Sequence, residues 1–132
     1  MFIKKKNFNH KHSTMFLQLA HTRLDVFNFS QELALECYKI TKLFPDHEKF
    51  AMVQQIRRAA MSVHLNIAEG CSRKSIVERR RFFEIARGSV IEIDTAIGIA
   101  HKLAYSTQEE LQGLGEKIIK TFKTLSGMIG KL

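Results

Sequence analysis

The sequence is poor in cysteine and contains no long apolar run. Only two cysteines, Cys37 and Cys71, occur among 132 residues, and their separation suits neither a disulfide framework nor a metal-ligand pair. We therefore expect a reduced, cytoplasmic environment. No apolar stretch approaches the roughly 20 residues of a membrane span, and a signal-sequence core is replaced by the short run Met15-Phe16-Leu17. These absences predict a soluble protein without a membrane partner.

Sequence motifs of common enzyme sites are also missing. The chain has no phosphate-binding glycine loop, no dinucleotide-binding glycine fingerprint and no zinc-hydrolase helix motif. His10-Lys11-His12 is a weak metal-binding tract, and His64 and His101 stand alone, whereas a zinc site needs three or four convergent donors. We expect no enzyme activity, no cofactor and no metal.

Positive charge exceeds negative charge along the chain. Lysine and arginine number 21 against 13 acidic residues, which gives a formal net charge of +8. In a chain this short, such a charge favours a polyanionic partner, and nucleic acid is the natural candidate. Small basic proteins without such a partner are also common, so charge alone leaves both interpretations open.

The first 23 residues differ from the rest of the chain. They contain no acidic residue and no sustained apolar periodicity, but several basic side chains: Lys4, Lys5, Lys6, Lys11 and Arg23. This composition predicts a basic, flexible N-terminal arm over residues 1–23, followed by one domain over residues 24–132. With 45% apolar residues, the chain can form a core without covalent cross-links.

Four amphipathic segments follow the arm, and none alternates with the period of a β-strand. The first has apolar residues at three- and four-residue steps over residues 26–44 and stops before Pro45, the only proline. The second carries a similar stripe over residues 53–67. It ends near Gly70, for which we expect the left-handed conformation of a helix C-terminal cap.

Two capping boxes open the remaining helices. Ser75 with Glu78, and Thr107 with Glu110, have the spacing at which these side chains satisfy free amides at a helix start. Steps of three and four residues predict a buried seam in the third helix: Phe82, Ile85, Ser89, Glu92, Ala96, Ile99 and Leu103. The fourth helix has its apolar face over residues 111–129. Together these segments predict an all-α, up-down-up-down antiparallel four-helix bundle.

Polar residues interrupt the second and third helices where a bundle helix ordinarily carries leucine. A carboxylate in the seam, Glu92, must be paired, because an unpaired buried charge costs several kcal/mol. We expect a network that fixes helix register or a subunit contact, formed by Arg57, Arg58, Asn66, Glu69, Ser89 and Glu92. A second interpretation makes Glu69 and Glu92 an acid–base pair, but no histidine or nucleophile has a matching spacing. Gly88, in mid-helix, predicts a close helix crossing.

A dense basic cluster surrounds the start of the third helix. Against Glu78 and Glu84 stand six basic side chains: Arg73, Lys74, Arg79, Arg80, Arg81 and Arg87. A helix N-terminus disfavours cations, so local stability does not explain three consecutive arginines there. They indicate a phosphate-binding surface or, equally, a solvated face whose arginine stems cover apolar surface.

Two blocks of residues carry a resemblance to a known family. The first lies in the second helix and comprises Gln55, Arg57, Arg58, Ala59, Asn66, Ala68, Glu69 and Gly70. The second lies in the third helix and comprises Phe82, Ala86, Gly88, Ser89 and Glu92. With these blocks, residues 24–132 resemble the four-helix-bundle proteins encoded within intervening sequences of bacterial 23S ribosomal RNA genes.

The resemblance implies a homopentamer with a basic surface that contacts RNA, and no established biochemical function. The chain is also distantly similar to the accessory variability proteins of diversity-generating retroelements, which implies a reverse transcriptase as a protein partner. The leading hypothesis is therefore a non-enzymatic, oligomeric bundle that binds structured RNA through residues 73–87 and the Lys4, Lys5 and Lys6 arm. The alternative is a protein-assembly adaptor whose polar blocks serve only core and subunit contacts.

Overall fold

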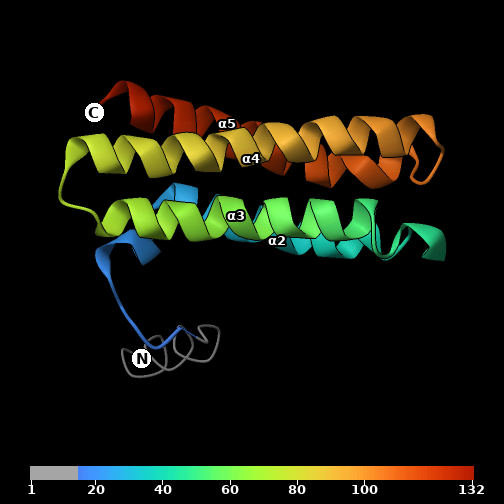
Figure 1. The fold of residues 1–132 in the computed structure, drawn as a ribbon, viewed down its shortest axis with the longest axis horizontal. Helices are drawn as coiled ribbons and strands as arrows, with labels where there is room; N and C mark the ends of the chain where they lie inside the picture. The colour runs from blue at the N-terminus through green and yellow to red at the C-terminus, as the bar shows by residue number, and fades with distance from the viewer. Residues whose placement is uncertain (1–14) are drawn as a thin grey trace, which may run out of the picture.

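The structure, a computed structural model, describes residues 15–132. Within these residues it contains helices and turns and no β-strand. In chain order the elements are the 3-10 turn η1 (Ala20–Arg23), α2 (Asp25–Thr41), the 3-10 turn η2 (Asp46–Glu48), α3 (Met52–Ser72), α4 (Ile76–Lys102) and α5 (Gln108–Gly130). Figure 1 shows the four long helices side by side. No helix in this part of the chain combines the length and hydropathy needed to cross a membrane.

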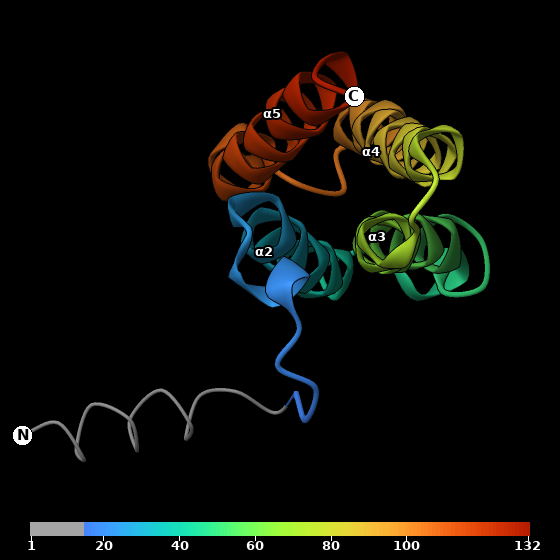
Figure 2. The ribbon, with the colours of Figure 1, turned by 90° about the vertical axis from the view of Figure 1, so that its left-hand side faces the viewer.

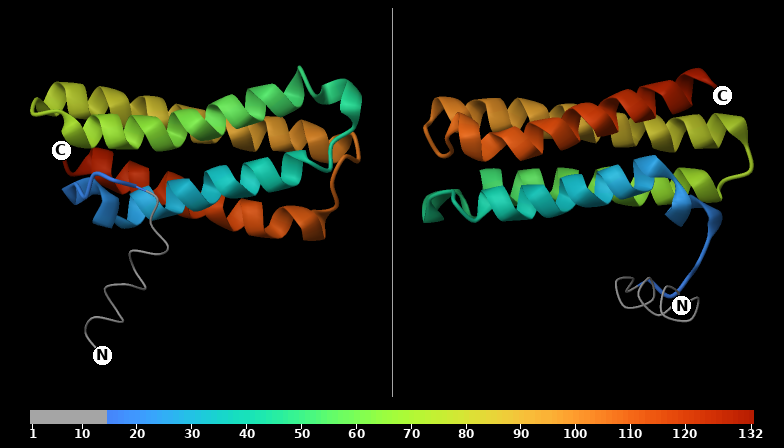
Figure 3. Two further views of the ribbon diagram at one scale, coloured as in Figure 1. Left: turned by 90° about the horizontal axis from the view of Figure 1, so that it is seen from below. Right: turned by 180° about the vertical axis from the view of Figure 1, so that it is seen from behind.

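The four long helices form an antiparallel bundle. Contacts run from α2 to α3, from α3 to α4, from α4 to α5 and from α5 back to α2. In the end-on view of Figure 2, α4 and α5 form one layer, and α2 and α3 form the other. The colour gradient in Figure 3 shows that the chain reverses direction at each turn. The predicted up-down-up-down four-helix bundle is confirmed.

The core takes side chains from one face of each long helix, including Leu33, Ile56, Phe83 and Leu125. Removing each such side chain from water contributes roughly 1.5–3 kcal/mol. The buried hydroxyls of Ser30, Thr41 and Thr121 donate to carbonyls within their own helices. Thr41 Oγ1, for example, donates to the Cys37 carbonyl at 2.7 Å. These hydroxyl groups are therefore paired, whereas Ser106 Oγ, in the turn before α5, is buried without a hydrogen-bond partner among the described residues.

The predicted starts of the last two helices are confirmed. Ser75 Oγ accepts from the Glu78 amide at 3.3 Å at the start of α4. Thr107 Oγ1 accepts from the Glu110 amide at 3.1 Å, while Glu110 Oε1 accepts from the Thr107 amide at 2.8 Å, which completes the capping box of α5. Local sequence therefore determines where both helices begin.

Both expectations about glycine are wrong. Gly70 lies inside α3, and no glycine of the described residues has a positive φ. Its role is close packing, because a Cβ at this position would lie 2.7 Å from Cε1 of Phe83 and 3.1 Å from Cβ of Phe82. At Gly88, by contrast, a Cβ would meet nothing within 4 Å. The close approach of α3 and α4 is thus at Gly70, and Gly88 lies on an open face.

The buried face of α4 is rotated by one residue from the predicted seam. Its buried residues are Phe83, Ala86, Ser89, Val90, Ile93, Ile97 and Ala100. Most of the predicted seam is exposed: Ile85, Glu92, Ile99 and Leu103. Paired apolar residues, such as Phe82 with Phe83, make the same spacing fit two faces about 100° apart. The observed face leaves the Glu92 carboxylate in water and so avoids its desolvation.

Residues 20–23, which the sequence assigned to the arm, form η1 and contact α2 and α3. The His21 ring packs edge-on against Phe27 with centroids 5.2 Å apart. The remaining predictions for the arm concern residues 1–14, which lie outside the described part of the chain. They include the lysine run at residues 4–6 and the histidine tract at residues 10–12.

Replacing Gly70 with alanine is expected to lower the free energy of unfolding by about 1–3 kcal/mol, because the new methyl group overpacks against the Phe83 ring. Gly88→Ala is the matched control. It is expected to raise the free energy of unfolding by about 0.5–1 kcal/mol, since alanine is the better helix former and the site is open. Urea unfolding followed by circular dichroism checks both values, and a stabilised Gly70→Ala variant would contradict this account of the α3–α4 contact.

Candidate nucleic-acid interface

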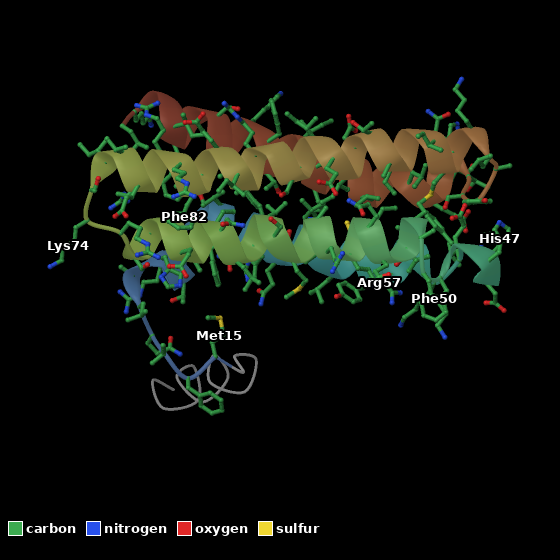
Figure 4. All side chains as sticks on the ribbon, viewed as in Figure 1. Met15, His47, Phe50, Arg57, Lys74 and Phe82 are labelled. Atoms are coloured by element: carbon green, nitrogen blue, oxygen red, sulfur yellow. The ribbon has the colours of Figure 1, made fainter. Side chains whose placement is uncertain are left out.

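The predicted basic cluster lies at one end of the bundle, around the turn between α3 and α4. α3 ends at Ser72 and α4 begins at Ile76, so Arg73 and Lys74 lie in the turn itself. In Figure 4, Lys74 extends from this turn away from the helices. The same end holds η1 and the C-terminus of α5 (Figure 1). The structure thus gathers the basic segment on a surface formed by several elements.

Two arginines of the cluster cover aromatic rings. The Arg73 guanidinium lies 5.0 Å from the centroid of Phe82 and pairs with Glu69 at 3.1 Å. The Arg79 guanidinium lies 6.0 Å from the centroid of Phe83. Their Nε atoms are buried and have no hydrogen-bond partner within the described residues. For these two residues, the interpretation in which arginine stems cover apolar surface is the better description.

Two further arginines join α4 to α5. Arg80 donates through Nη1 to the Ile129 carbonyl at 3.4 Å, and Arg87 donates through Nη1 to Ser126 Oγ at 3.3 Å. The contact of Arg80 is made in the last turn of α5, where unpaired carbonyls and the helix dipole favour a cation. These side chains therefore serve the fold, although their charges remain near the surface.

Lys74 and Arg81 are the exposed members of the cluster. Among the described residues, neither forms a hydrogen bond or an ion pair. Arg81 borders a shallow depression together with Arg80 and Glu84, so one carboxylate is close to this surface. The cations that are available to a ligand are thus fewer than the sequence indicated.

A polar contact does join α3 to α4, but it is smaller than predicted. Ser89 Oγ donates to Ser62 Oγ at 2.9 Å across the two helices. On α3, Asn66 Nδ2 donates to the Ser62 carbonyl at 2.8 Å and lies 3.1 Å from Ser62 Oγ. Asn66 and Ser89 are therefore linked through Ser62, a residue that was not among the predicted members.

The burial predicted for Glu92 is wrong. The carboxylate is exposed, and its Oε2 accepts a hydrogen bond from Gln55 Nε2 at 2.5 Å. Glu69 pairs with Arg73 at the other end of α3. Since α3 rises 1.5 Å per residue, about 21 Å of helix separates Gln55 from Glu69. The structure therefore does not bring Glu69 and Glu92 together as an acid–base pair.

The two arginines predicted for the network also diverge. Arg57 reaches α2, where its Nε donates to Thr41 Oγ1 at 2.9 Å and its guanidinium lies 4.7 Å from the centroid of the Tyr38 ring. Arg58 is exposed on the outer face of α3. Neither forms a hydrogen bond or ion pair with Glu92 in the described residues: Arg57 is directed towards α2, and Gln55 of α3 is the partner of Glu92.

Comparison with known proteins agrees with this fold. A family profile described as 23S rRNA-intervening sequence protein matches residues 22–127, which is well over half of the chain. The chain belongs to this family. The family resemblance inferred from the two sequence blocks is confirmed.

One solved structure is similar to this intervening-sequence protein over most of its length. It is a protein with unknown function from the S23 ribosomal protein family of Bacteroides thetaiotaomicron VPI-5482. The TM-score is 0.73 at 24% identity, and the alignment covers 79% of this chain and 97% of that chain. At this level of identity the likeness shows the fold alone. No curated protein matches the chain.

A groove of about 670 Å³ on the outer face of α2 and α3 is a feature of this family member that sequence periodicity missed. Its walls include Tyr38, Phe50, Arg57 and Arg58. Phe50 lies just before α3 and is 83% exposed. An aromatic residue in the connection after Pro45, outside both apolar stripes, was the signal that would have pointed to this face.

The histidines and cysteines of this intervening-sequence protein do not form a metal site in the described residues. Burial, reinforced by Glu36, raises the pKa of Cys37 to about 12, so its thiol stays protonated. His64 packs against Phe27 with ring centroids 4.3 Å apart, and its Nδ1 lies 2.7 Å from Ser30 Oγ. Burial, followed by the nearby His21, lowers the pKa of His64 below its ordinary value.

The low pKa of His64 predicts a loss of stability in mild acid. As the pH falls below about 6.5, the unfolded chain takes up a proton at this histidine while the folded chain keeps it neutral, so the free energy of unfolding decreases. Urea unfolding between neutral and mildly acidic pH is expected to show a smaller decrease for His64→Gln than for the unsubstituted protein. His101→Gln, at an exposed histidine, should leave the decrease unchanged. Equal pH dependence in all three proteins would contradict the assignment.

Proposed function

We propose that this protein is a non-enzymatic, oligomeric bundle that binds nucleic acid, with RNA as the preferred partner. The observation that carries the proposal is the exposure of Lys74 and Arg81 at the end of the bundle where the α3–α4 turn lies. Exposed Arg23 of η1 and Lys131 after α5 belong to elements at the same end, so the positive charge extends across the surface (Figure 1).

Phosphate contacts from such a surface release counterions and do not depend on base sequence. A few exposed cations on one protomer support only weak binding. Several protomers that engage one nucleic acid multiply these contacts, because each later contact is intramolecular. The proposal therefore joins the basic end to self-association and implies binding that weakens steeply as salt increases.

Reversing the two exposed charges tests the interface. The Lys74→Glu, Arg81→Glu double variant is expected to bind a structured RNA on the order of tenfold or more weakly, with a flatter dependence on salt, because phosphate contacts are lost. Fluorescence anisotropy across a salt series measures both effects.

The matched control for this variant is Lys42→Glu, Lys102→Glu. It makes the same change in net charge at exposed residues at the ends of α2 and α4, the opposite end of the bundle. If both double variants weaken binding equally, the effect is one of net charge. If the unsubstituted protein does not bind RNA at low salt, the proposed function fails.

Self-association is supported by an apolar face on the layer formed by α4 and α5. A depression of about 330 Å³ lies between these helices, and its lining includes Ile91, Ile119 and Phe122. Ile91 is 51% exposed and Ile119 is 54% exposed, so a second copy that covers them would bury apolar surface. Asp94 and Lys123 line the same depression and provide both signs of charge. We propose that the contact is head-to-tail with a rotation that closes into a ring of five copies, a homopentamer.

Ile119→Lys is expected to shift the assembly towards monomer, because each interface would have to remove an ammonium group from water. Light scattering measures the mass. Leu35→Lys is the matched control, since Leu35 is 66% exposed on α2, in the other layer of the bundle. The assignment of the α4–α5 face is wrong if Leu35→Lys dissociates the assembly while Ile119→Lys does not.

A second candidate function is that of a protein-assembly adaptor, with a partner such as a reverse transcriptase. It is supported by Ile76 and Val77, apolar side chains that remain exposed at the start of α4. Co-purification with a reverse transcriptase that survives nuclease and high salt, together with no RNA binding at low salt, would favour this role over the first.

A further inference from the structure

The groove on the outer face of α2 and α3 combines aromatic rings with cations. Phe50 presents a ring that is 83% exposed, and the Lys49 ammonium lies 5.5 Å from the centroid of that ring. On the facing wall, the Arg57 guanidinium lies 4.7 Å from the centroid of Tyr38. Figure 4 shows Phe50 and Arg57 on the same side of the bundle.

The wall at Arg57 is held in place by protein contacts. Its Nε donates to Thr41 Oγ1 at 2.9 Å, and its Nη2 donates to the Tyr38 carbonyl at 3.4 Å. The side chain and the ring it covers are therefore fixed against each other before any ligand binds. Such preorganisation reduces the entropy that a ligand must overcome on binding.

The charge of the groove is of one sign. Lys49, Arg57 and Arg58 line it, and no acidic residue is among its lining residues. Val53, Met61 and Leu65 add apolar surface to the lining, and Gln54 and Asn66 add amide groups. Cations beside aromatic and apolar surface match a ligand that carries both phosphates and flat rings.

Nucleic acid has this chemistry, and only unpaired bases expose their faces to a protein. Proteins that bind single strands combine a basic groove with aromatic side chains on which bases stack, whereas a duplex keeps its bases stacked on each other. We propose that the α2–α3 groove binds a single-stranded segment of nucleic acid, with a base stacked on Phe50 and phosphates at Lys49 and Arg58. This inference rests on the proposed function and adds the strand state that the protein recognises.

The test compares Phe50→Leu with Phe16→Leu, which changes a phenylalanine that is 97% exposed outside the groove. Leucine keeps apolar bulk but removes the ring. Binding of a labelled oligouridine is expected to weaken roughly 5- to 150-fold for Phe50→Leu, the range given by the loss of one stacked base. Phe16→Leu should bind as the unsubstituted protein does. An RNA hairpin with a minimal loop, which lacks free bases, should bind both variants equally.

A direct measure of stacking is the fluorescence of 2-aminopurine placed in the oligonucleotide. Quenching on binding to the unsubstituted protein, and its reduction in Phe50→Leu, supports the proposal. If oligouridine binds equally to both variants, or if Phe50→Leu changes the oligomer mass in light scattering, the groove is not a stacking site and the proposal is overturned. Lys74 and Arg81 are intact in both variants, so a variant that has lost only the groove still binds the hairpin. If the proposed function is wrong, the unsubstituted protein binds neither the hairpin nor oligouridine.

Discussion

The contact between Gly70 and the Phe83 ring is the constraint on which the arrangement of α3 and α4 depends. A side chain at position 70 would occupy the space of the ring. The contact therefore fixes both the position of α4 along α3 and the rotation of α4 about its own axis. From this point the antiparallel course of α4 brings Ser89 opposite Ser62 and Glu92 opposite Gln55. It also places the arginines at the start of α4 beside the turn. The polar contacts therefore follow from the packing and do not determine it.

Helix starts and the bundle topology could be predicted because they depend on neighbouring residues. Thr107 and Glu110 cap α5 through hydrogen bonds between residues three apart in the sequence, which do not depend on contacts with other helices. The rotation of α4 could not be predicted in this way. Phe82 and Phe83 are equally apolar, and the choice between them depends on the absence of a side chain at Gly70, one helix earlier. A single error of one residue then placed Glu92 in the core and gave it partners that it does not have.

Prediction of the candidate interface from the sequence is limited in a similar way. A count of arginines measures charge, but it does not show whether a guanidinium is already in use. Arg80 binds the end of α5 and Arg73 lies over Phe82, and both contacts join residues from different helices or turns. Phe50 illustrates the opposite case, because its exposure depends on how the connection to α3 folds and not on apolar spacing. Arginine suits such shared use, since its planar group can stack on a ring and still donate hydrogen bonds.

The rotation of α4 leaves one helix with two apolar faces. The inner face supplies the core, and the outer face carries Ile85 and Ile99, beside Gly88. The two faces lie about 100° apart, which is the rotation from one helical residue to the next. Which face meets the core therefore depends on the number of residues in the helix as well as on their types. Insertion of one residue before Ile85 would turn the side of α4 that carries Ile85, Glu92 and Ile99 towards the core. We therefore expect this helix to tolerate many single substitutions in evolution but few changes in length.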